Sequence, residues 1–185
     1  FEFTEWSHKI RDIEGKNKIK SVWFLANSTH VVDLAFHLCG FPKEWQSWSS
    51  GSLDWHPASA RFSGAGITDQ NVVFSYFADW EAPGRWGVEV MTRKNRLILR
   101  PMEQLQITPH GSIKVEPVPL EDKLDRDFKP GLYRQTEAFL NQDSTYFCTL
   151  KEQAKNAELY AKMAGYKKCK ASLASNSKRI IQSEP

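Results

Sequence analysis

Three polar side chains that can carry chemistry, His30, Asp33 and His37, lie inside one of the most apolar stretches of the chain, residues 22–40. On an ideal helix at about 100° per residue, Asp33 falls about 300° and His37 about 340° from His30, so the three form one stripe opposite the apolar residues. Imidazole titrates near neutral pH and can pass a proton to or from a substrate hydroxyl. Asp33, three residues on, is placed to reach the imidazole or the ligand.

Two other interpretations of this stripe stay open. A polar stripe opposite an apolar face is also what an ordinary surface helix shows. The three side chains are chemically suitable metal ligands, but they span seven residues, or about 10 Å of helix. One ion cannot easily contact both ends of that span at about 2.0–2.2 Å, and the other histidines add no cluster, so we expect no metal site.

The segments around the stripe predict how it is positioned. Residues 19–27 have the β-branched and aromatic content of a short buried strand. A cluster of N-cap residues at 27–29 and the glycine at position 40 delimit a helix over residues 29–39, entered directly from that strand. His30 then lies in the first turn of the helix, at the kind of junction where ligand sites are often built.

The rest of the chain predicts an α+β fold. A short amphipathic helix is expected over residues 5–13. Short segments with partial period-two alternation, broken by turn signals, fill the middle of the chain and predict a meander of antiparallel strands. The clearest hairpin pairs residues 86–90 with residues 96–100. Helical periodicity returns in residues 131–142 and 147–165.

We therefore predict one domain over residues 1–185, with an open, mostly antiparallel sheet and helices packed on one face. Gly64, Ala65 and Gly66 look like the start of a dinucleotide-binding fingerprint. Because a third glycine and a following helix are missing, we interpret them as a turn between strands. Tryptophans concentrated in the strand region predict sheet packing or a subunit interface, with a carbohydrate-stacking platform as the alternative.

Composition narrows the class of protein. The chain is 41% hydrophobic and 25% charged, which is typical of a packed soluble protein, and it has no run of about 18 apolar residues. From its opening residues we expect no signal peptide. Three widely separated cysteines favour a reducing, cytoplasmic setting. The basic segment 166–179 lacks interleaved aromatic residues, so we expect a solvated tail, no nucleic-acid partner and no membrane partner.

Three segments in the same order resemble the C-terminal domain of the Gfo/Idh/MocA (glucose-fructose oxidoreductase and inositol dehydrogenase) family: NSTHVVDLAFHLCGFP (27–42), EAPGRWGVEVMTRKNRLILRPMEQLQ (81–106) and FKPGLYRQTEAFL (128–140). The resemblance implies a dihydrodipicolinate-reductase-like C-terminal domain. In that family an N-terminal Rossmann domain binds NAD or NADP and supplies a catalytic lysine. That domain is absent from this chain, which begins at Phe1 rather than Met, so we expect the chain to be a piece of a longer protein.

The resemblance also assigns residues. His30 matches the family's proton-transfer histidine, and Asp33 matches the acidic residue that follows it in the helix. The fullest form of the motif has Asp four residues before the histidine, where this chain has alanine, and Asn27 is the nearest polar residue. Arg85 and Trp86 resemble residues that face the substrate cleft or its rim. We therefore expect a catalytic His30 and substrate contacts from Asn27, Asp33, Arg85 and Trp86.

What the resemblance implies about function is an NAD(P)-dependent oxidoreductase that acts on a sugar, sugar nucleotide or polyol. The C-terminal domain would bind this carbohydrate and form a homo-oligomer through the outer face of its sheet. No cofactor is expected on this chain alone. The competing hypothesis is a non-catalytic α+β binding or assembly module, in which the helix stripe only faces solvent and the tryptophan-rich sheet is an interface.

Overall fold

The computed structural model describes residues 1–145 and 147–166 of the chain. The predicted basic tail at 166–179 therefore lies, beyond its first residue, outside the described residues. The helices are α1 (Ser7–Arg11), α2 (Asn17–Lys20), the π-helix η1 (Phe24–Ser28), α3 (Thr29–Cys39), α4 (Lys123–Asp127), α5 (Leu132–Leu140) and α6 (Leu150–Ala164). The strands are β1 (Pro42–Ser50), β2 (Arg61–Thr68), β3 (Val73–Asp79), β4 (Val88–Met91), β5 (Asn95–Leu99), β6 (Leu105–Pro109) and β7 (Glu116–Val118).

These elements form the predicted α+β fold. One antiparallel sheet has the order β1-β2-β3, and a second has the order β4-β5-β6-β7. The N-terminal segment joins them, because Glu2 forms a parallel bridge with Phe77 of β3 and an antiparallel bridge with Gly87 just before β4. The Glu2 amide donates to the Gly87 carbonyl at 2.9 Å, and the Gly87 amide donates back at 3.0 Å. The N-terminus is thus fixed inside the sheet system.

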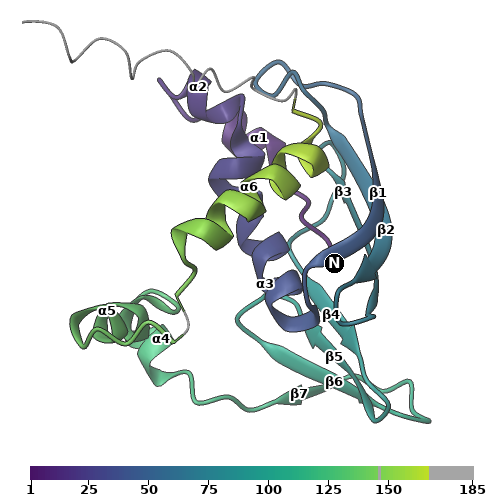
Figure 1. Cartoon of the computed structure of the whole chain (residues 1–185), viewed down its shortest axis with the longest axis vertical. Coiled ribbons are helices and arrows are strands. Elements are labelled where there is room, and N and C mark those ends of the chain that lie inside the picture. Colours follow the sequence, from purple (N-terminus) through teal and green to yellow (C-terminus); the bar gives the residue numbers. More distant parts are fainter. Residues whose placement is uncertain (146, 167–185) are drawn as a thin grey trace, which may run out of the picture.

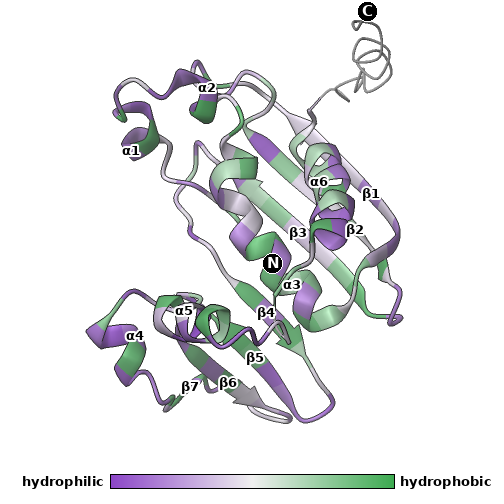
Figure 2. Ribbon diagram, turned by 60° about the vertical axis from the view of Figure 1, so that its left-hand side comes forward, coloured by the Kyte–Doolittle hydropathy of each residue, from purple (hydrophilic) through white to green (hydrophobic). Residues whose placement is uncertain are grey.

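The helices α3 and α6 cover one face of the sheet β1-β2-β3 (Figures 1 and 2). Helix α6 packs against β1, β2 and η1, and α3 packs against η1 and β4. The core between the layers is apolar and aromatic; its fully or almost fully buried side chains include Phe3, Phe24, Val31, Val32, Trp80 and Met163. None of the helices in the described part of the chain has the length and apolar character that a membrane crossing requires.

The predicted helix over residues 29–39 is confirmed by α3, which ends at Gly40 with a φ of 90°. The predicted strand before it is wrong, because residues 19–27 contain the end of α2, a turn and most of η1, and η1 continues directly into α3. Short apolar runs do not distinguish a buried strand from a buried helix. The buried positions here recur with helical spacing: Phe24, Ser28, Val31, Val32 and Ala35. His30 therefore lies at a junction between a π-helix and an α-helix.

The interpretation of Gly64 and Gly66 as a turn is also wrong. Both lie inside β2, where Gly64 pairs with Tyr76 and Gly66 pairs with Phe74. A Cβ atom at Gly64 would collide with the Tyr76 ring, and one at Gly66 would collide with Trp45. Glycine is needed here because large side chains lie directly against the strand. The predicted hairpin is confirmed by β4 and β5, and the late helices by α5 and α6.

A buried histidine makes the stability of the fold depend on pH. His56 is completely buried; its Nδ1–H donates to the Ser59 carbonyl at 2.6 Å, and the Tyr166 hydroxyl donates to Nε2 at 2.7 Å. Both ring nitrogens are therefore satisfied in the neutral form. Burial lowers the pKa of His56 below its usual value of 6.5. Below that pH the unfolded chain takes up a proton that the folded chain excludes, so stability falls as the solution is acidified.

We expect the free energy of unfolding to fall when the pH is lowered from about 7.5 to about 5.5. Urea denaturation followed by circular dichroism measures it. His56→Asn keeps a donor for the Ser59 carbonyl but does not titrate, so its stability should vary less over the same interval. His110→Asn, at an exposed position, should keep the full pH dependence. Equal pH dependence in the two variants would show that His56 is not the responsible group.

Candidate functional site

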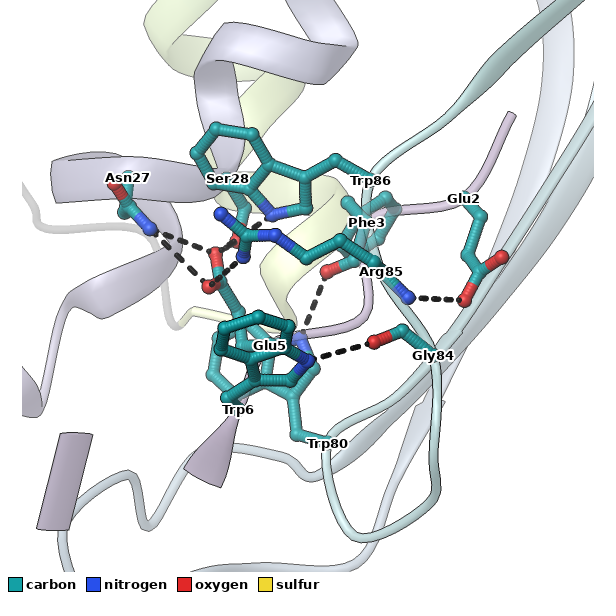
Figure 3. A network of polar contacts seen from close by, with 10 residues as sticks. All are labelled: Glu2, Phe3, Glu5, Trp6, Asn27, Ser28, Trp80, Gly84, Arg85 and Trp86. Carbon is teal, nitrogen blue, oxygen red and sulfur yellow. Dashed lines mark hydrogen bonds and ion pairs between the residues drawn. The ribbon is translucent and has the colours of Figure 1, made fainter. Parts of the chain in front are cut away.

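A buried carboxylate, Glu5, connects three separate parts of the chain (Figure 3). The side chain is 2% exposed. The Ser28 hydroxyl donates to its Oε1 at 2.7 Å, and the Trp86 indole Nε1–H donates to the same atom at 3.2 Å. The Asn27 amide nitrogen lies 3.1 Å from each carboxylate oxygen, and Nη1 of Arg85 lies 3.7 Å from Oε2. Glu5 thus holds together the N-terminal segment, the end of η1 and the loop before β4.

Opposing influences act on the ionisation of Glu5. Burial is the largest and raises the pKa of the carboxyl above 4.5. The hydrogen bond from Ser28, the positive charge of Arg85 and the hydrogen bond from Asn27 act against it and favour the carboxylate. The side-chain nitrogen of Asn27 donates to Glu5. The side-chain oxygen of Asn27 is therefore the group that can accept a hydrogen bond from a ligand.

The side chain of Arg85 lies between two tryptophans (Figure 3). Its Cζ atom is 4.4 Å from the ring centroid of Trp86 and 4.9 Å from that of Trp6. The Trp6 indole is itself held by a hydrogen bond to the Gly84 carbonyl at 3.0 Å. Stacking on both faces restricts the guanidinium, although the side chain stays 43% exposed. The structure therefore presents a pre-positioned cation at the surface.

His30 lies near the Trp86 ring. Its ring centroid is 6.1 Å from that of Trp86, and the residue is exposed. The packing of α3 against β4 explains this proximity, because Trp86 comes just before β4 and His30 is in the first turn of α3. Four of the five predicted site residues are thus brought together: His30, Asn27, Arg85 and Trp86.

Asp33 is engaged elsewhere. Its Oδ1 accepts a hydrogen bond from the Tyr160 hydroxyl at 2.8 Å and another from the Asn156 side chain at 3.2 Å, both from α6. Burial, and then the neighbouring Asp33, raises the pKa of Tyr160. The carboxylate therefore joins α3 to α6 in this structure, and its contact with a substrate stays a prediction.

Two residues of this site, Glu5 and Trp6, are not among the site residues predicted from the sequence. Sequence reasoning placed both in an amphipathic helix over residues 5–13, whereas α1 begins at Ser7. Only a tertiary contact shows that Glu5 is buried, since a single Glu next to a Trp carries no periodic signal. The pair did stand close to the start of an amphipathic segment, which is the one local hint that the chain contains.

An open cleft of about 630 Å³ adjoins the network through Glu5, Trp6 and Gly84. It is lined by residues 5–8, Arg11, Leu53 and residues 80–84. Clefts of roughly 300–1,000 Å³ are typical of small-molecule sites. In the described part of the chain, no three His, Cys, Asp or Glu side chains gather closely enough to hold a metal ion. The cleft has aromatic faces from Trp6 and Trp80, whereas Asn27, Arg85, Trp86 and His30 lie outside its lining.

Comparisons of the chain with protein-family models, with curated proteins and with solved structures give no match. The functional hypothesis therefore depends on the residues and their geometry.

Proposed function

We propose that this chain is the substrate-binding and oligomerisation domain of an NAD(P)-dependent oxidoreductase that acts on a sugar, sugar nucleotide or polyol. The observation that carries the proposal is the gathering of His30, Asn27, Arg85 and Trp86 around the buried Glu5, from parts of the chain far apart in sequence. An exposed imidazole next to an aromatic wall is suited to exchange a proton with a carbohydrate hydroxyl.

The proposed chemistry is reversible oxidation of a carbinol. NAD or NADP, held by a separate domain, would supply the acceptor for the hydride of the carbinol carbon, and the residues of this chain would bind the substrate and handle its hydroxyl proton. His30 takes the hydroxyl proton, and in the reverse direction it returns that proton. The Asn27 carbonyl oxygen accepts a hydrogen bond from a second hydroxyl, and the Trp86 ring contacts the apolar face of the substrate.

The proposal places NAD or NADP on a separate Rossmann domain. Gly64 and Gly66, the two glycines that look like the start of a dinucleotide fingerprint, do not fit a dinucleotide, because the space above them is filled by Tyr76 and Trp45. A pyrophosphate needs an open glycine-rich turn followed by a helix. This chain then supplies the substrate side of the active site, and the partner domain supplies the hydride acceptor.

The outer face of the sheet supports the oligomerisation part of the proposal. Trp48 of β1 and Phe77 of β3 flank Ser63 of β2 in one cross-strand row, and each is 58% exposed. Val73, on the same side of β3 as Phe77, is about four-fifths exposed. Exposed apolar side chains gathered on a sheet favour an interface. The same face is the observation that favours the alternative, a non-catalytic assembly module.

A cytoplasmic setting belongs to the proposal as well, since Cys39 and Cys148 are both free.

A substrate screen tests the proposal. The longer protein that the proposal requires, with a nucleotide-binding domain joined to this chain, is incubated with NAD⁺ or NADP⁺ and a panel of polyols, aldoses and sugar nucleotides. We expect substrate-dependent formation of reduced nicotinamide with at least one member of the panel, and none from the 185-residue chain alone. If the isolated chain bound NADH with micromolar affinity or oxidised a polyol unaided, the proposed division between two domains would be wrong. No turnover by the complete protein would favour the assembly module.

A further inference from the structure

Arg85 differs from the other well-placed arginines of the chain because its donors are unused. Arg100 contacts Glu2 at 2.8 Å between Nη2 and Oε2, and Arg61 contacts Glu81 at 2.5 Å. The Arg85 guanidinium is 3.7 Å from Glu5, beyond hydrogen-bonding distance. Within the described residues, the hydrogen bond that Arg85 makes comes from its backbone amide, to Glu2 at 3.2 Å. Its five side-chain N–H groups have no acceptor in the described part of the chain.

The position of these donors is fixed in advance. The Trp6 and Trp86 rings hold the two faces of the guanidinium, so its donors, which lie in the plane, are directed away from the rings. A flexible surface arginine loses rotamer freedom when it binds, and a stacked one has already lost it. The paired in-plane N–H groups of such a pre-positioned guanidinium, called the fork below, match the paired oxygens of a carboxylate or phosphate.

The charge around the fork is positive on balance. Lys9 places its Nζ atom 4.3 Å from the centroid of the Trp6 ring, so the same indole contacts two cations. Glu5 lies beneath as a buried carboxylate, and burial raises its pKa. Glu2, the other nearby acid, is paired with Arg100. Two cations, Lys9 and Arg85, thus share the Trp6 indole, and one buried acid lies next to Arg85; this excess of positive charge favours an anion at the surface.

We infer that Arg85 recognises an anionic group, a carboxylate or a phosphate monoester, on the carbohydrate that binds beside Trp86. The inference rests on the proposed function for the nature of the substrate and adds that the substrate is acidic: a sugar acid or a sugar phosphate. The oxygens of the anion accept hydrogen bonds from the Arg85 fork, while the sugar ring lies along the aromatic wall toward His30.

The test compares three probes that share a hexose ring: D-glucuronate, D-glucose 1-phosphate and neutral D-glucose. Each is titrated into the ¹⁵N-labelled 185-residue chain at constant ionic strength, and the indole N–H signals of Trp6 and Trp86, assigned with Trp→Phe variants, are followed by NMR. We expect saturable shifts with at least one anion. D-glucose should bind at least about tenfold more weakly than that anion. A shift with only one anion identifies the source of the charge, and a shift with both confirms the shared chemistry.

The matched variants are Arg85→Gln and Arg96→Gln. Arg96, on β5, is also an exposed arginine with a carboxylate partner of its own, so its loss controls for net charge. Arg85→Gln should weaken binding of the anion about tenfold or more, whereas Arg96→Gln should not. Arg85→Lys keeps the charge without the fork and should fall between them. Equal affinity of the two glutamine variants, equal binding of glucose and glucuronate, or no binding of either anion would overturn the inference. The proposed function fails separately, through the substrate screen.

Discussion

Glu5→Ala is expected to lower the free energy of unfolding by about 2–4 kcal/mol. The substitution leaves Ser28, Asn27 and the Trp86 indole without the acceptor that they share, and Ser28 is completely buried. It also removes the carboxylate that balances Arg85. Relief from burying a charge offsets part of this cost, because burial raises the pKa of Glu5 in the folded protein. Urea denaturation at pH 7 measures the change.

Two further variants separate the contributions. Glu14→Ala removes the same side chain from an exposed position and should change stability by less than about 0.5 kcal/mol. Glu5→Gln keeps one acceptor for Ser28 and Trp86 and removes the buried charge, but its NH₂ group then faces the donors of Asn27 and Arg85, so its cost should lie between those of the two alanine variants. If Glu5→Ala were as stable as Glu14→Ala, Glu5 would not be the residue that holds the site together.

How well sequence reasoning works here depends on the range of the interactions. The bounds of α3 and the hairpin of β4 and β5 follow from local signals: Gly40 after the last apolar turn, and a tight turn between alternating segments. The predicted strand at 19–27 fails because both of its faces contain apolar residues, which removes the difference between a period of 2 and a period of 3.6. The predicted turn at Gly64 and Gly66 fails for another reason. Glycine is needed in β2 because the bulky Tyr76 lies against Gly64 from the neighbouring strand, and no local pattern shows this.

The candidate site likewise contains one residue that a local pattern predicts and others that only long-range contacts bring together. His30 can be found from its position on an amphipathic helix, since the helical pattern fixes which face it occupies. The proximity of Asn27, Arg85 and Trp86 depends on Glu5, whose burial follows from insertion of the N-terminal segment between β3 and β4. No periodic pattern reports such an insertion. Asp33 shares a helix with His30, yet α6 occupies its carboxylate through Tyr160, a contact across 127 residues.

His30→Ala in the complete protein is expected to lower kcat by roughly 10²–10⁴-fold, the usual contribution of a positioned acid–base group. Without the imidazole, the hydroxyl proton must leave directly to solvent as the hydride departs. The fold should be unaffected, because His30 is exposed and its ring packs only loosely near that of Trp86, with 6.1 Å between the ring centroids. The value of KM should change much less than kcat, since the proposal assigns binding to Asn27, Arg85 and Trp86. Steady-state kinetics with the substrate found in the screen measures both constants.

The most direct test of the central claim, that His30 handles the substrate proton, is the rate of hydride transfer in a single turnover. That rate is measured by stopped-flow detection of reduced nicotinamide for the wild type, His30→Ala and His37→Ala. His37 is a second exposed histidine on α3, seven residues further along. We predict that His30→Ala slows the transfer at least a hundredfold and that His37→Ala leaves it within about twofold of the wild type. Equal rates in the two variants would contradict the account.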